Sequence, residues 1–134
     1  MTTRACGTFD VTMTPQMPND KADDTSVGRM SIDKRFHGDL AATSTGHMLS
    51  VGTAVAGSAG YVAMERVTGI LHGHSGVFAL QHSGTMTRGT PQLTVVVVPD
   101  SGTDQLVGLA GTMTIDIVGG EHVYDFAYTL PEFQ

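Results

Sequence analysis

The sequence has few of the residues on which several classes of protein depend. Its one cysteine, Cys6, excludes an intrachain disulfide and a cysteine-based zinc site. It has 7 Lys and Arg residues against 13 Asp and Glu, and the resulting charge of −6 argues against a nucleic-acid partner, which needs clustered cations. No apolar run approaches the ~20 residues of a membrane-spanning helix, and the first residues lack the apolar core of a signal peptide. We therefore expect a cytoplasmic protein with no membrane partner.

The composition is typical of a β-sheet protein. Charged residues make up only 15% of the chain, and no segment shows sustained helical periodicity. Instead, 17 glycines accompany many Thr, Ser and Val residues. The 134 residues are enough for one domain with one hydrophobic core. We predict a single domain over residues 1–134, with an exposed loop at 15–26.

Segments of strand length recur between turn signals. The segment 29–36 alternates between two faces with one exception, Lys34. Gly119-Gly120 is a strong signal for a two-residue hairpin turn. The predicted strands cover residues 9–13, 29–36, 39–51, 61–71, 77–86, 92–98, 111–118 and 122–130, with turns at 73–76 and 99–102.

Strands joined by short links favour a meander, and closure is the most economical way to bury its edges. The predicted fold class is therefore all-β, a closed antiparallel eight-stranded barrel. Residues 61–71 carry apolar side chains on both faces, with Val62 and Met64 opposite Tyr61 and Val67. Because a barrel needs only one apolar face, we also predict a homo-oligomer, a dimer or a trimer.

Several stretches resemble one bacterial family. They are GRMSIDKRFHGDLAAT at 28–43, GYVAMERV at 60–67, QHSGT at 81–85 and DSGT at 100–103. Together they resemble the domain-of-unknown-function family 3224, over nearly the whole chain from about Gly7 to Pro131. The resemblance implies a barrel similar to those of allene oxide cyclase and dirigent proteins. The stretch GTDQLVGLAG is similar to a glycine-spaced turn of those barrels, except that Asp104 replaces a glycine. The family implies no agreed reaction.

One pair of residues is a candidate for acid–base chemistry. Glu65 lies in the middle of a predicted strand, and alternation places it on the same face as Tyr61. On the neighbouring strand, Phe78 and His82 share a face. If both faces point inward, a carboxylate and an imidazole enter one apolar cavity, where burial is expected to raise the pKa of Glu65 and prepare the pair for proton transfer. The alternative is an outward Glu65 paired with Arg66, and a His82 bonded to a backbone carbonyl.

A second motif, Asp100-Ser101-Gly102-Thr103, follows an apolar run, as a similar triplet does in aspartic peptidases. That chemistry needs two carboxylates that share one proton. The chain has one copy of the motif, so a homodimer would have to bring two Asp100 residues together. The alternative is an ordinary turn between strands, for which Asp, Ser and Gly are typical.

Three functions remain open. The preferred one is a barrel that binds a small apolar or mixed-polarity molecule, with isomerase- or cyclase-type chemistry. In that function Glu65 and His82 are the catalytic acid and base, and Tyr61 and Phe78 contact the ligand. The second is an aspartic-peptidase-like homodimer that uses Asp100, and the third is a non-catalytic structural or interaction barrel. No cofactor or metal is expected, since the one close histidine pair lies at a turn with no third ligand nearby.

Overall fold

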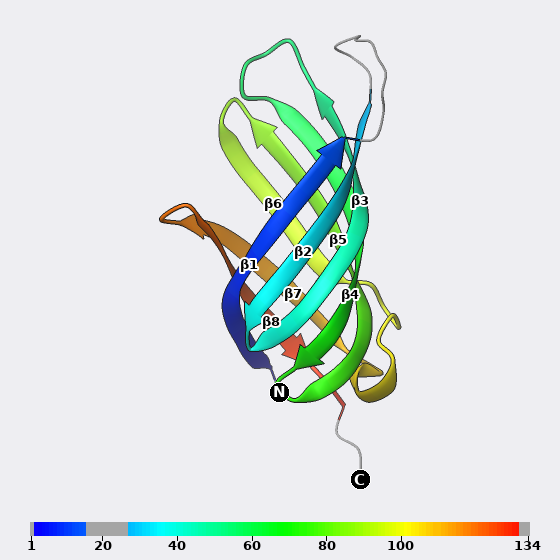
Figure 1. Cartoon of the computed structure of the whole chain (residues 1–134). Coiled ribbons are helices and arrows are strands. Elements are labelled where there is room, and N and C mark those ends of the chain that lie inside the picture. Colours follow the sequence, from blue (N-terminus) through cyan, green and yellow to red (C-terminus); the bar gives the residue numbers. More distant parts are fainter. Residues whose placement is uncertain (1, 16–26, 132–134) are drawn as a thin grey trace.

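The computed structural model describes residues 2–15 and 27–131. Eight antiparallel strands form a closed barrel in which each strand pairs with the next, and the last pairs with the first (Figure 1). A short 3-10 helix, η1 (Asp104–Leu106), precedes the seventh strand, and no helix in the described ranges is long and apolar enough to cross a membrane. The predicted all-β barrel is confirmed. The strands are β1 (Thr3–Pro15), β2 (Gly28–Gly38), β3 (Leu40–Gly52), β4 (Ala59–Leu71), β5 (His74–Thr87), β6 (Thr90–Val97), β7 (Ala110–Val118) and β8 (Glu121–Thr129).

The first predicted strand, one predicted loop and one predicted turn need correction, since β1 begins at Thr3 and not at residue 9. Pro15 belongs to β1, and residues 16–26 of the predicted loop lie outside the described residues. The turn predicted at 73–76 is shorter, because β4 and β5 pair as far as Leu71 and His74. The turn is His72-Gly73, whose φ angles are 46° and 83°. Positive φ at both central residues matches the right-handed twist of the two strands. The strands can therefore stay paired as far as the two residues of the turn.

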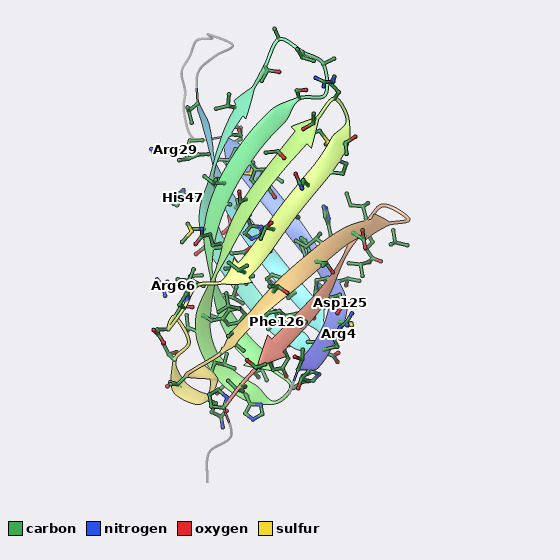
Figure 2. The ribbon with its side chains drawn as sticks, turned by 180° about the vertical axis from the view of Figure 1, so that it is seen from behind. Arg4, Arg29, His47, Arg66, Asp125 and Phe126 are labelled. Atoms are coloured by element: carbon green, nitrogen blue, oxygen red, sulfur yellow. The ribbon has the colours of Figure 1, made fainter. Side chains whose placement is uncertain are left out.

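Side chains alternate between the interior of the barrel and its outer wall. In β4, Glu65 is buried, whereas Val62, Met64 and Arg66 are exposed. Figure 2 shows Arg66 on the outer wall and Arg4 beside Asp125, an ion pair that joins β1 to β8. The second apolar face expected on this strand is therefore present on the outer wall. The homo-oligomer inferred from it stays a prediction.

One end of the barrel interior, called here the packed half, is filled with aromatic and aliphatic side chains. The Phe126 ring stacks on Phe78 with ring centroids 6.0 Å apart, and its centroid lies 5.3 Å from that of Tyr128. The Tyr124 hydroxyl accepts a hydrogen bond from the amide of Leu40 at 2.9 Å. Other members of this core are Phe36, Val67, Leu71, Leu80, Leu106 and Leu109. A continuous core of this kind holds the strands in one register.

Candidate functional site

The rest of the interior, called here the hollow half, contains a cavity of about 530 Å³. Its lining residues lie toward the end of the barrel where β6 and β7 diverge. These two strands pair only through Val96 and Thr112, and Figure 1 shows them separating beyond that point. Side chains from both strands line the cavity, so this weakly paired seam is part of its wall. The lining is mainly apolar and includes Val11, Ile32, Met48, Ala63, Leu93 and Ile115.

Four buried polar residues, Lys34, Ser44, Glu65 and His82, form one cluster in the barrel, called here the buried cluster. The Lys34 Nζ donates a hydrogen bond to Glu65 Oε2 at 2.8 Å, and His82 Nε2 lies 2.5 Å from the same oxygen. The Ser44 hydroxyl donates to Glu65 Oε1 at 2.5 Å. Both carboxylate oxygens of Glu65 are thus hydrogen-bonded. Its three partners come from the strands β2, β3 and β5.

The buried cluster lies between the cavity and the packed half. Along the inward face of β4, Ala63 lines the cavity and Val67 belongs to the core, with Glu65 between them. Lys34 and His82 both line the cavity. The Lys34 ammonium also lies over an aromatic ring of the core edge, 4.7 Å from the centroid of Phe9, a favourable position for a cation. The cluster therefore forms the inner end of an otherwise apolar cavity.

The charge state of Glu65 differs from the sequence-based expectation. Burial raises the pKa of its carboxyl, but the hydrogen bond from His82 and the positive charge of Lys34 outweigh burial and lower the pKa to about 2. The expected rise was wrong because it considered burial without the hydrogen bond from His82 and without the ammonium that faces the carboxylate. Glu65 is consequently an anion at neutral pH, and it cannot serve as the proton donor of the pair.

This shift predicts that the folded protein loses stability in acid. A carboxyl with a depressed pKa in the folded state stabilises the fold above its unfolded pKa, and this contribution disappears as the pH falls toward the folded pKa. For Glu65 the window runs from about 4.5 down to about 2. The full contribution is about 3 kcal/mol, of which about 2 kcal/mol is lost by pH 3. Urea denaturation between pH 7 and pH 3 measures it.

Glu65→Gln is the matched control for this titration, because it keeps the shape of the side chain and cannot ionise. The variant is expected to be less stable than the wild type at pH 7, with a smaller loss of stability between pH 7 and pH 3. The difference between the two proteins isolates Glu65 from the other carboxyls. Equal losses in both proteins would show that Glu65 does not titrate as described.

The structure brings together two of the predicted site residues and places a third nearby. Glu65 and His82 both point inward and bond to each other, so the alternative of an outward Glu65 paired with Arg66 is wrong. Tyr61 lines the cavity, and burial together with the charge of Glu65 raises its pKa. Its ring lies against Gly84 so closely that any side chain there would collide with it. The roles predicted for these residues in catalysis and binding remain proposals.

Phe78 and Asp100 lie apart from this group. Phe78 is 1% exposed in the packed half, and it is not among the residues that line the cavity. Asp100 is exposed in the loop after β6, with a φ of 63°. The next residue, Ser101, accepts a hydrogen bond from the amide of Ala79 at 3.0 Å, and Gly102 packs directly on a backbone carbonyl of the η1 segment. These contacts explain the motif as a turn that fastens the loop to β5, while a catalytic Asp100 dimer stays a prediction.

Sequence reasoning missed Lys34 and Ser44 as site residues. Lys34 did carry a signal, since it was the one residue that broke the alternation of its segment. A lysine at an inward position needs a buried anion, and Glu65 is the only glutamate in mid-strand. Ser44 carried no comparable signal. Among residues 2–15 and 27–131, no group of three or more His, Cys, Asp and Glu side chains is arranged to hold a metal ion.

Comparison with known proteins places the chain in a family. A family model described as "Protein of unknown function (DUF3224)" matches residues 5–128. The chain belongs to the DUF3224 family. A solved crystal structure of a DUF3224 protein of unknown function from Shewanella oneidensis MR-1 is similar to it, with 47% sequence identity and a TM-score of 0.92. The match covers 99% of this chain and 100% of the other.

The predicted resemblance to this family is therefore confirmed, and so is the barrel that it implied. No curated protein matches the chain significantly. The finer likeness of this DUF3224 barrel to allene oxide cyclase and dirigent barrels stays a prediction.

Proposed function

We propose that this DUF3224 protein binds a small, mostly apolar molecule in the hollow half of its barrel, and that His82, oriented by Glu65, exchanges a proton with it. The observation that carries the proposal is the cavity of about 530 Å³ with Lys34 and His82 at its inner end. Small-molecule sites are typically concave, mostly apolar and supplied with a few convergent polar groups, at volumes of roughly 300–1,000 Å³.

Unused hydrogen-bonding capacity in the cavity supports the proposal. Within the described part of the chain, His82 Nδ1 and the Tyr61 hydroxyl have no hydrogen-bond partner. The Lys34 ammonium has three N–H donors, and Glu65 is its one acceptor in the same ranges. Buried polar groups normally have partners, so a bound molecule with a polar head group would complete this site.

The chemistry proposed here modifies the acid–base roles expected from the sequence. Because Glu65 is ionised, it accepts the Nε2 proton of His82 and holds the ring in one orientation. Proton transfer then falls to His82 alone, at Nδ1, with chemistry of the isomerase or cyclase type. Tyr61 keeps the role predicted for it from the sequence, which is to contact and orient the ligand.

Fluorescence of N-phenyl-1-naphthylamine, a neutral apolar dye, tests the binding part of the proposal. We expect saturable enhancement with the wild type. Ala63→Phe, which places a ring in the cavity, is expected to weaken binding by at least about tenfold. Ala41→Phe, at an exposed position on the outer wall, is the matched control and should bind as the wild type does.

Ile115→Trp, which changes a cavity-lining residue of β7, is the second blocking variant if Ala63→Phe does not fold. Circular dichroism establishes which variants are folded. The proposal fails if the wild type does not enhance the dye, or if a folded blocking variant binds the dye as tightly as the Ala41→Phe control.

A further inference from the structure

Lys34 takes no part in the proton exchange proposed for His82, yet it occupies an unusual position. Its side chain is 6% exposed, it lines the cavity, and Glu65 is its one hydrogen-bond acceptor within the described ranges. A buried ammonium with spare donors is a strong binding point for an oxygen atom that carries or develops negative charge. The surrounding wall offers it few polar atoms, because the cavity lining is mainly apolar.

His82 supplies the complementary group next to Lys34. Its Nε2 and the Lys34 Nζ both lie within hydrogen-bond distance of one atom, Glu65 Oε2, so the two side chains are immediate neighbours at the inner end of the cavity. With Nε2 protonated toward the carboxylate, a neutral His82 has Nδ1 free as a proton acceptor. A single bound molecule can therefore contact a hydrogen-bond donor and a base together.

We propose that the substrate is an enolisable carbonyl compound with an apolar body, and that Lys34 binds its carbonyl oxygen while His82 removes a proton from the adjacent carbon. This inference rests on the proposed binding function and names the substrate class for the same site. The carbonyl oxygen and the acidic C–H of such a compound lie close together in one small head group, which matches an ammonium and an imidazole ring that are immediate neighbours at the inner end of the cavity.

The proposed step is balanced within the site. The C–H bond breaks and its proton forms an N–H bond at His82 Nδ1. The C–H electron pair forms the carbon–carbon double bond of the enolate, and the carbonyl π pair moves onto oxygen, where the Lys34 ammonium stabilises it. Return of the proton to the same carbon gives exchange, and return to the far end of a conjugated system gives a double-bond isomer. No oxidant, reductant or co-reactant is consumed.

Deuterium exchange in D₂O, followed by proton NMR, tests the inference with three apolar ketones: 2-tetralone, 2-decanone and 4-phenyl-2-butanone. We expect the wild type to accelerate α-proton exchange of at least one ketone by about tenfold or more over buffer. General base catalysis typically contributes about 100-fold or more, so this threshold allows for a ketone that fits the cavity imperfectly. His82→Gln and Lys34→Met are expected to abolish the acceleration. Both should bind N-phenyl-1-naphthylamine within about threefold of the wild type, because the apolar wall is intact.

Lys34→Gln, which keeps a donor for Glu65, replaces Lys34→Met if the latter does not fold. His47→Gln is the matched control, because His47 is exposed on the outer wall (Figure 2) and should leave exchange unchanged. If the dye binds and no ketone exchanges faster, the substrate class is wrong and the binding function stands. If neither occurs, both proposals fail. Acceleration that survives in folded His82 or Lys34 variants would overturn the assignment of these residues.

Discussion

Replacing Glu65 with leucine is expected to lower the free energy of unfolding by about 3–5 kcal/mol. The substitution removes the carboxylate that pairs with Lys34 and bonds to His82, and leaves the ammonium in the barrel interior without its anion. A buried charge without a partner retains its full desolvation cost. Urea denaturation at pH 7, followed by circular dichroism, measures the difference from the wild type.

A second substitution in the same variant tests this cause. Adding Lys34→Met removes the unpaired ammonium, and we expect it to restore most of the lost stability, since apolar side chains can replace a buried ion pair at little cost. Glu121→Leu, at an exposed position, is the matched control and is expected to change stability by less than about 0.5 kcal/mol. A double variant no more stable than Glu65→Leu alone would contradict this explanation.

Replacing Phe126 with alanine is expected to cost about 3–5 kcal/mol of the free energy of unfolding. Phe126 lies on β8 (Figure 2), and its ring is fully buried. In the packed half of the barrel it contacts Phe78 and Tyr128. Close-packed neighbours on strands that are themselves paired relax only partly, so the deletion leaves a void. Urea denaturation measures the loss, and the folded variant should still bind N-phenyl-1-naphthylamine, because Phe126 does not line the cavity.

Ile117→Ala provides the comparison in the hollow half. Ile117 lines the cavity and is 68% exposed, so its truncation creates no buried void. We expect it to lower the free energy of unfolding by less than about 0.5 kcal/mol. The two variants therefore separate the half of the barrel that stabilises the fold from the half that is open to a ligand. Similar costs for Phe126→Ala and Ile117→Ala would show that this division of the interior is wrong.

The common face of Glu65 and His82 could be predicted because it depends on local geometry alone, whereas the inward direction of that face was one of two alternatives. Side chains alternate with a period of two, and β4 and β5 are consecutive strands joined by a two-residue turn. His82 pairs directly with Ala63, the inward neighbour of Glu65 on its own strand. The turn was predicted to have four residues and has two, but a change of two residues keeps each side chain on the same face of its strand.

The partners and the charge of Glu65 could not be predicted in this way. Lys34 and Ser44 come from β2 and β3, and their height relative to Glu65 depends on how far each strand is staggered against the next. The sequence-based expectation considered only burial as an influence on the carboxyl, so the predicted direction of its pKa was reversed. The hydrogen bond from His82 and the positive charge of Lys34, which lies on a strand distant in sequence, together decided the charge of the site.

By itself, then, the sequence determined the all-β class, the approximate strands, the family, and the shared face of Glu65 and His82, because these follow from local periodicity, turn residues and recognisable stretches. Only the tertiary structure decided which part of that face lines a cavity. Phe78 lies where Phe126 fills the barrel, and Tyr61 lies where the facing Gly84 leaves room. Such filling depends on side chains that closure of the barrel brings together from strands far apart in the sequence, and no local pattern records it.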